Sequence, residues 1–236
     1  MPEFAFIIPS TSNKRDDWKS AEDSYLWSIL CSSLEKYTPD IGNRRIKLFI
    51  GFDEDDRIYS IEEERLKFSA VFMNFDIEFF PQSVCLKGKL STIWNNLGKE
   101  ALDQGYDYIK LMGDDIRIPS DTGWLGLFAN KLKKNNNIGF SAGWSNNDNI
   151  PTQFLVHKTH YEIFGFFYPE EIETWGVDDA LYQLYPAKYR NWMKSYPLLN
   201  VGGSPRYEIT FSEKFVKAIV KRHKPKLNRF LQQLNE

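Results

Sequence analysis

The sequence predicts an α/β protein with a mostly parallel central sheet flanked by helices, and three observations lead to this fold class. Short apolar runs of strand length alternate with segments in which apolar residues recur every three or four positions. Such alternation is typical of βαβ units, whose strands lie parallel in one sheet. The chain has 236 residues, of which 42% are hydrophobic and 26% charged, and this length and composition suit a single globular domain.

Strands and helices follow one another regularly in the first half of the chain. Residues 92–104 illustrate the helical pattern, because Ile93, Leu97 and Ala101 recur every four positions before Gly105, a residue type that favours the end of a helix. We expect strands at residues 4–9, 46–52, 76–80 and 106–112, and helices at residues 18–37, 61–72 and 92–104.

The second half contains two segments of loop composition. Residues 145–149 consist of serine, asparagine and aspartate, and residues 194–206 include two prolines and two glycines. Ser212 is a favourable cap for a final helix. We expect further helices at residues 123–134, from His160 and from Asp178, and strands at residues 138–144 and 152–156.

Charge and cysteine content restrict the possible classes of protein. The formal net charge of −2 disfavours a dedicated nucleic-acid binder, which needs a basic surface. Two cysteines are too few for a disulfide framework, and no apolar run approaches the roughly 20 residues of a membrane span. The amino terminus has no basic leader of the signal-peptide type. We therefore expect a cytoplasmic protein without a transmembrane segment.

Two adjacent carboxylates mark the end of the strand predicted at residues 106–112. Asp114 and Asp115 follow Gly113 directly, and in an open α/β sheet ligands collect beyond the carboxyl ends of the strands. Both carboxylates can reach one cation only if the chain turns there, and glycine permits such a turn. Carboxylate oxygens are hard ligands that favour Mg²⁺ or Mn²⁺. The sequence therefore predicts a divalent metal site at Asp114 and Asp115.

Further motifs lie where other strands meet loops. Residues 8–15 follow the first strand, residues 49–53 end the second, and residues 87–97 precede the carboxylate pair as Lys-Gly-Lys-Leu-Ser-Thr-Ile-Trp-Asn-Asn-Leu. With the later Gly-Asp-Asp-Ile and Gly-Trp motifs, this series resembles nucleotide-sugar glycosyltransferases of the GT-A fold, which is Rossmann-like, and in particular giant-virus (chlorovirus-type) and algal glycosyltransferases. The resemblance spans most of the chain.

The resemblance implies roles for individual residues on the donor side. Asp115 would bind the metal and Asp114 the metal or the ribose, although Gly113 stands where the first aspartate of the family's Asp-X-Asp motif would fall. Asp53 would accept a hydrogen bond from the base or ribose. The remaining residues expected near the nucleotide sugar are Pro9, Ser10, Thr11, Arg15, Lys87, Lys89, Asn95 and, from a closing loop, Arg206.

The acceptor side of the resemblance rests on residues 156–179. In inverting members an acid from this region serves as general base, and Asp178 or Asp179 could take the proton from the acceptor hydroxyl. The alternative is structural, because aspartate is a favoured N-cap and stabilises the start of a helix. By the same resemblance, residues 1–116 form a nucleotide-binding half, residues 117–211 an acceptor half and residues 212–236 a C-terminal helix of the single domain 1–236.

The resemblance thus predicts a hexosyl- or deoxyhexosyltransferase that uses Mn²⁺ or Mg²⁺, a UDP- or GDP-sugar donor and a glycan or glycoconjugate acceptor. It implies a role in glycan biosynthesis, with the cytoplasm of a virus-infected host cell as one location. Two alternatives stay open. A sugar-phosphate nucleotidyltransferase has a similar sheet, but its first strand normally opens into a glycine-rich loop, and residues 9–13 contain no glycine. A carbohydrate-binding module would keep the fold without turnover, and Asp114, Asp115, Asp178 and Asp179 argue against it.

Overall fold

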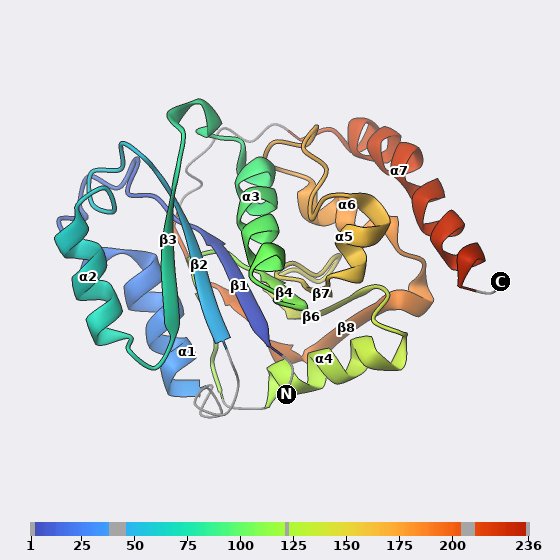
Figure 1. Cartoon of the computed structure of the whole chain (residues 1–236), viewed down its shortest axis with the longest axis horizontal. Helices are drawn as coiled ribbons and strands as arrows, with labels where there is room; N and C mark the ends of the chain where they lie inside the picture. Colours follow the sequence, from blue (N-terminus) through green and yellow to red (C-terminus); the bar gives the residue numbers. More distant parts are fainter. Residues whose placement is uncertain (1–2, 38–45, 121–122, 204–210, 235–236) are drawn as a thin grey trace.

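A seven-stranded sheet runs through the centre of the computed structural model, which describes residues 3–37, 46–120, 123–203 and 211–234 (Figure 1). Its strand order is β3-β2-β1-β4-β7-β6-β8. In chain order these strands are β1 (Phe4–Pro9), β2 (Ile46–Asp53), β3 (Asp76–Gln82), β4 (Tyr108–Leu111), β6 (Phe140–Trp144), β7 (Leu155–His157) and β8 (Arg190–Pro197). A separate pair consists of β5 (Ile116–Arg117) and β9 (Leu199–Asn200).

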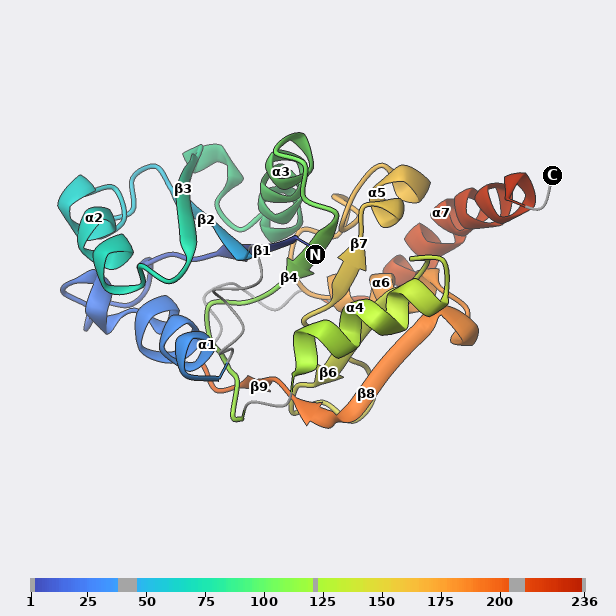
Figure 2. The same cartoon turned by 60° about the horizontal axis from the view of Figure 1, so that its bottom comes forward.

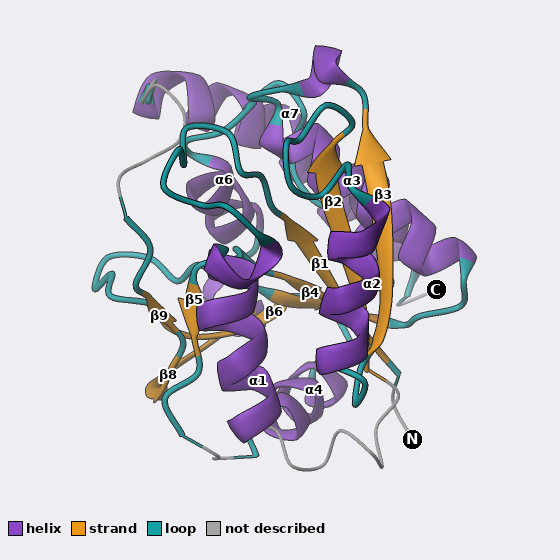
Figure 3. Cartoon of the chain, turned by 90° about the vertical axis from the view of Figure 1, so that its left-hand side faces the viewer, coloured by secondary structure: helices purple, strands orange, loops and turns teal. Residues whose placement is uncertain are grey.

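The sheet is mostly parallel, as the sequence predicts. Strands β3, β2, β1 and β4 pair in parallel, and β6 pairs in parallel with β8. Only β7 runs in the opposite direction within this sheet, between β4 and β6. Figure 3 shows β1, β2 and β3 side by side. The α/β fold class is therefore confirmed.

Helices cover both faces of the sheet (Figure 2). Alternate residues of β1 explain why, because Phe4 and Phe6 join one buried cluster while Ala5 and Ile7 join the other. The first cluster includes residues from α1 (Ser32–Tyr37), α2 (Glu62–Val71) and α4 (Trp124–Lys134). The second includes residues from α3 (Leu90–Asp103), α5 (Thr159–Phe164), α6 (Val177–Leu184) and α7 (Glu213–Gln233).

Parallel pairing brings the carboxyl ends of β1, β2 and β4 to one edge of the sheet. Pro9 of β1 is opposite Gly51 of β2, and Ile7 is opposite Leu111 of β4. The loops that follow these three strands therefore begin side by side.

Among the described residues, no helix is both long and apolar enough to cross a membrane.

The helix predicted at residues 18–37 is broken at Ser24, and residues 25–37 are continuously helical but change from a π-helix to an α-helix. A 3₁₀ turn at Ala21–Asp23 ends at Ser24, a π-helix follows at Leu26–Cys31, and α1 begins only at Ser32. Ser24 Oγ donates to the Ala21 carbonyl at 2.6 Å and Ser32 Oγ to the Trp27 carbonyl at 2.7 Å. Serine hydroxyls that bond to nearby carbonyls compete with regular helical bonds, which the apolar pattern alone does not reveal.

Two further expectations were wrong in detail. Residues 194–206 were predicted as one loop, but β8 continues to Pro197 and β9 occupies Leu199–Asn200. The proline is tolerated because β8 lies at the edge of the sheet, where an N–H donor is not needed. The N-cap of α6 is Gly176, in a left-handed conformation, so Asp178 and Asp179 lie in the first turn and do not cap the helix. Ser212 does cap α7, since its side chain accepts from Phe215 N at 3.3 Å.

Candidate active site

A cavity of about 560 Å³ lies at the edge of the sheet where β1, β2 and β4 end. Its walls also include Trp94 of α3, Trp175, and the first turn of α6, so both halves of the chain contribute to it. This size is within the range of small-molecule sites. Nine of the residues predicted for the site line the cavity: Pro9, Ser10, Thr11, Arg15, Asp53, Asp114, Asp115, Asp178 and Asp179.

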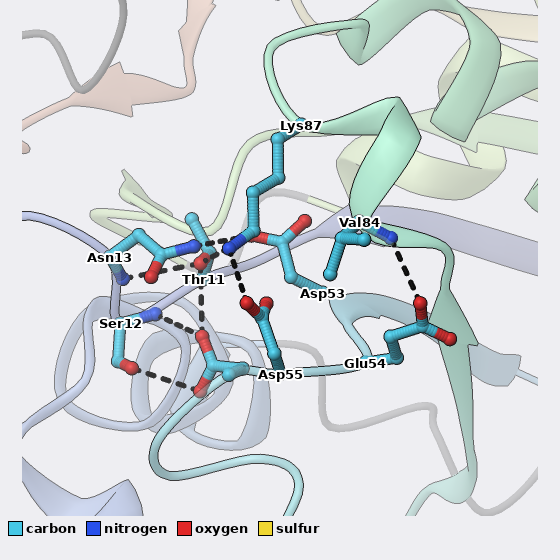
Figure 4. A network of polar contacts seen from close by, with 9 residues as sticks. Thr11, Ser12, Asn13, Asp53, Glu54, Asp55, Val84 and Lys87 are labelled. Carbon is cyan, nitrogen blue, oxygen red and sulfur yellow. Dashed lines mark hydrogen bonds and ion pairs between the residues drawn. The ribbon is translucent and has the colours of Figure 1, made fainter.

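The loop after β1 is fastened to the end of β2 by a polar network (Figure 4). Thr11 Oγ1 lies 3.0 Å from Asp53 Oδ2, and Asn13 Nδ2 donates to the same oxygen at 2.6 Å. Asp53 is only 5% exposed, and burial raises the pKa of its carboxyl despite these two donors. The network fixes the backbone of residues 10–13 along one wall of the cavity.

Asp56 also holds the loop after β1 through hydrogen bonds, and it was not predicted as a site residue. It is fully buried and accepts from Ser12 N at 2.6 Å, from Ser12 Oγ at 2.9 Å and from Tyr59 N at 2.9 Å. Thr11 Oγ1 lies 2.9 Å from the same carboxylate. Residues 53–56 are four consecutive acids at the end of a strand, a composition typical of a solvated turn, and the sequence does not show which of them is buried.

Asp114 and Asp115 face different surroundings at the end of β4. Asp114 is 3% exposed and accepts a 2.8 Å hydrogen bond from Ser10 Oγ, which ties it to the loop after β1. Asp115 is half-buried, and its carbonyl accepts from Val201 N at 3.1 Å. The turn therefore joins three strand ends around the cavity.

Two glycines enclose the Asp115 carboxylate. A Cβ atom at Gly113 would lie 2.8 Å from Asp115 Oδ1, and one at Gly202 would overlap Asp115 Oδ2. A side chain at position 113, where the family's Asp-X-Asp motif has its first aspartate, would therefore require the Asp115 carboxylate to shift. Close approach of the backbone is a common reason for glycine at such positions.

The donor set at this turn fits a divalent metal that completes its shell with ligand oxygens. Asp114 and Asp115 supply carboxylate oxygens, which suit Mg²⁺ and Mn²⁺. A metal site made of protein ligands alone would need a cluster of at least three His, Cys, Asp or Glu side chains, and the described parts of the chain contain no such cluster. A bound diphosphate would have to provide the missing oxygens, as Mg²⁺ sites with few protein ligands commonly require.

Asp178 has the environment of an acid that can exchange a proton near neutral pH. It lies in the first turn of α6 and lines the cavity, and Tyr168 OH donates to its Oδ1 at 3.2 Å. Burial and the neighbouring Asp179 raise its pKa to about 7, although the tyrosine hydroxyl and the charge of Lys110 act in the opposite direction. A carboxyl with this pKa suits general acid–base chemistry.

Asp179 also lines the cavity but lies in a more open position. Burial raises the pKa of its carboxyl, and the charge of Glu213 at the start of α7 adds to this effect. The shift is smaller than that of Asp178 because less of the side chain is removed from water. Of the two acids, Asp178 is better placed to act as a base.

Three predicted residues lie outside the cavity walls. Lys87 Nζ forms an ion pair with Asp55 at 2.7 Å (Figure 4), and Lys89 is the N-cap residue of α3. Asn95 is buried, and its amide accepts from Phe167 N and Tyr168 N at 2.8 and 2.9 Å and donates to Tyr168 O at 2.8 Å. These bonds tie α3 to the segment before α6. A nucleotide contact by these three residues stays a prediction. Arg206 lies outside the described residues.

Several cavity residues were not predicted. Trp94 and Trp175 contribute aromatic surface, and Asn146, Asn147 and Gln153 contribute amides. Residues 145–149 were recognised as a loop by composition, and the runs of asparagine were the available signal for a polar cavity wall. Gln153 carried no local signal, because its position depends on bonds to distant residues.

Comparison with known proteins shows a likeness in fold to solved structures. No family model and no curated protein matches the chain. The structure is similar to "Mannosyltransferase PcManGT from Pyrobaculum calidifontis in complex with GDP-Man and Mn2+", with a TM-score of 0.53 and 10% identity over 100% of this chain and 65% of that one. This chain thus spans slightly less than two thirds of the mannosyltransferase.

A second similar structure is a cytidylyltransferase from Leptospira borgpetersenii serovar Hardjo-bovis, with a TM-score of 0.52 and 11% identity over 96% of this chain and 97% of that one. The shared feature is the fold. Both neighbours are transferases, and the GT-A-like architecture expected from the sequence is confirmed by them. The resemblance to giant-virus and algal enzymes is not tested by either comparison and stays a prediction.

Proposed function

We propose that this protein is a metal-dependent glycosyltransferase that moves a sugar from a nucleoside-diphosphate sugar to a hydroxyl of a glycan or glycoconjugate. The observation that carries the proposal is the shared cavity, which is lined by the carboxylates Asp114 and Asp115 and by the partly buried acid Asp178. Asp114 and Asp115 suit the binding of a metal and a diphosphate, and Asp178 suits the role of a base. A cavity that holds a metal site and a base can stabilise the diphosphate leaving group and activate the acceptor hydroxyl.

The donor would lie along the first wall of the cavity. The fixed loop of residues 10–13 offers backbone and hydroxyl groups, and Asp53 offers a carboxylate acceptor beside it. Arg15 lines the same wall and supplies the positive charge that a diphosphate requires. A divalent ion at Asp114 and Asp115 would neutralise the negative charge that grows on the leaving diphosphate. The mannosyltransferase neighbour was determined with GDP-Man and Mn²⁺, which supports this arrangement.

Asp178 would act on the acceptor. Its carboxylate would take the proton from the acceptor hydroxyl as the oxygen bonds to the anomeric carbon and the bond to the diphosphate breaks. The proton moves to Asp178 and the electron pair of the broken bond leaves with the diphosphate. Attack from the side opposite the leaving group would invert the anomeric configuration. The apolar and aromatic wall that includes Trp94 and Trp175 would receive the sugars.

The direct test is release of nucleoside diphosphate. The protein is incubated with UDP-sugars and GDP-sugars, each with Mn²⁺ or with EDTA, and a mixed set of glycan acceptors. We expect one donor to release its nucleoside diphosphate only when both Mn²⁺ and an acceptor are present. No release from any donor, in spite of metal-dependent nucleotide binding, would favour the carbohydrate-binding alternative.

A nucleotidyltransferase is the second candidate, because the cytidylyltransferase shares the fold over 97% of its length. This reaction joins a sugar phosphate to a nucleoside triphosphate and releases pyrophosphate. It needs no general base facing a sugar hydroxyl, so the environment of Asp178 favours the glycosyltransferase. Pyrophosphate formed from a nucleoside triphosphate and a sugar phosphate would decide for the second candidate.

A further inference from the structure

Strand β4 carries a lysine where its neighbours are apolar. Lys110 has no exposed surface and lies between Ile109 and Leu111 in the centre of the sheet. Burying an ammonium group is unfavourable unless the group has partners, and burial lowers the pKa of Lys110 well below its usual value. Stability alone does not explain a lysine here, because apolar residues of similar size are often equal or better replacements for buried charges.

The amine of Lys110 lies between α4 and Gln153, a residue of the cavity wall. Trp124 and Phe128 of α4 surround it, with ring centroids 5.7 and 5.8 Å from Nζ. Nζ donates a hydrogen bond to the backbone carbonyl of Gln153, the residue two positions before β7. The aromatic rings favour a cation and leave the carbonyl as its polar partner.

Gln153 transmits this contact to the turn that holds the carboxylate pair. Its backbone has a φ of 56°, in the left-handed region that a non-glycine residue adopts only when its surroundings hold it there. Its side-chain Oε1 accepts a 2.8 Å hydrogen bond from Gly113 N. Two hydrogen bonds therefore connect Lys110 to the residue immediately before Asp114.

We propose that Lys110 is a positioning residue that acts through Gln153 to hold the turn of Asp114 and Asp115 in the orientation that binds a metal–diphosphate group. The chain of contacts runs from the Lys110 amine to the Gln153 carbonyl, and from the Gln153 amide oxygen to the Gly113 N–H. The lysine selects the strained backbone of Gln153, and that backbone aims the amide at the turn. This inference rests on the proposed function for its ligand, but the positioning itself can be measured without one.

The first experiment uses Lys110→Met, which keeps a similar volume and removes the donor. Lys47→Met is the matched control, because Lys47 is a largely buried lysine of strand β2 whose partner is Glu78 at 2.7 Å, away from the cavity. Amide hydrogen exchange at Gly113 is measured in both variants without ligand. We expect exchange at Gly113 to accelerate at least about tenfold in Lys110→Met and to stay at the wild-type rate in Lys47→Met.

The second measurement is the affinity for UDP and GDP by calorimetry, with and without Mn²⁺. Loss of residues that orient metal ligands typically lowers metal affinity about 10- to 100-fold. We expect Lys110→Met to weaken the Mn²⁺-dependent affinity by about tenfold or more while the metal-free affinity changes less than about twofold. A lysine with only a structural role would lower the melting temperature and leave this ratio unchanged, as expected for Lys47→Met.

A second pair of variants covers the case in which Lys110→Met does not fold. Gln153→Met removes the acceptor for Gly113 N together with a 3.4 Å bond from the amide nitrogen to Thr152, whereas Gln153→Glu loses that donor but keeps an acceptor oxygen. We expect rapid exchange at Gly113 in Gln153→Met and protection in Gln153→Glu, and no additional effect of Lys110→Met in the Gln153→Met background. Unchanged exchange and affinity in both Lys110→Met and Gln153→Met would overturn the inference. If wild type binds neither nucleotide with Mn²⁺, the proposed function fails, and the exchange rates still decide whether Lys110 positions the turn.

Discussion

The carboxylates on the two sides of the cavity differ in how the protein holds them. On the side of β1 and β2, Asp53 and Asp56 each accept bonds from several hydroxyl or amide donors of the loop after β1. On the side of α6, the described residues provide Asp178 with one side-chain donor, Tyr168, at 3.2 Å, and burial raises the pKa of Asp178 to about 7. Burial raises the pKa of both Asp53 and Asp178, and donors that bond to a carboxylate act against this effect, so the difference between these two acids is one of degree.

The comparison separates rigid binding from proton exchange. Asp53 and Asp56 hold the backbone of the loop after β1 through their hydrogen bonds. In the proposed function, Asp178 would exchange a proton instead. Each prediction below tests one side of this difference.

The largest effect is expected for Asp178→Asn. The amide keeps the size of the side chain but cannot take a proton, and loss of a general base typically lowers the rate about 10²- to 10⁴-fold. We expect such a fall in kcat in a donor-release assay, with donor affinity close to that of wild type. Asp179→Asn is the matched control and should lose less than about tenfold. Equal losses in both variants would contradict the assignment of the base to Asp178.

On the opposite side, Asp56→Ala should destabilise the protein strongly. The substitution leaves the buried donors Ser12 N and Tyr59 N without their acceptor, and each such group costs about 1–3 kcal/mol. We expect a loss of about 3 kcal/mol or more in urea unfolding. Asp55→Ala removes only the exposed pair with Lys87 and should cost less than about 1 kcal/mol. A small loss for Asp56→Ala would show that the loop after β1 is held by other contacts.

Asp115→Ala tests the metal at the turn between the two sides. Removal of one of two carboxylate ligands should weaken Mn²⁺-dependent nucleotide affinity by about 10-fold or more, since the metal then keeps only Asp114 from the chain. Calorimetry with and without Mn²⁺ measures the effect. Ser10→Ala is a useful control, because it removes the 2.8 Å bond to Asp114 but no ligand, and its effect should be smaller. Metal-dependent binding that survives in Asp115→Ala would move the metal site elsewhere.

The sequence predicted the acids that line the cavity better than the side chains that hold the cavity walls in place. Acids at the ends of parallel strands must meet at one edge of the sheet, so Asp53, Asp114 and Asp115 could be placed together from strand positions alone. Asp56 and Gln153 could not, because their roles arise from hydrogen bonds to residues 44 and 40 positions away. No local pattern records such distant pairs.

The fold shows the same limit. Strands β1, β2 and β4 were predicted because buried parallel strands are continuous apolar runs. The broken helix before α1 was missed because serine hydroxyls, not apolar spacing, decide its form. Strand β9 was missed because its two residues depend on pairing with β5, which lies more than 80 positions earlier in the chain.

The smallest predicted effect concerns the dependence of stability on pH, and it comes from the raised pKa of Asp178. The folded-state pKa of about 7 lies above the ordinary aspartate value of 3.8, so the native state binds the proton more tightly than the unfolded state. The stabilising contribution is fully present below about pH 3.8 and is lost as the pH rises through about 7. Asp178→Asn removes this dependence. We expect the variant to melt a few degrees above wild type at pH 8, with a narrower difference at pH 5. If Asp178→Asn melts below wild type at pH 8, the ionised carboxylate is stabilised by its surroundings, and the contrast between the two sides of the cavity disappears.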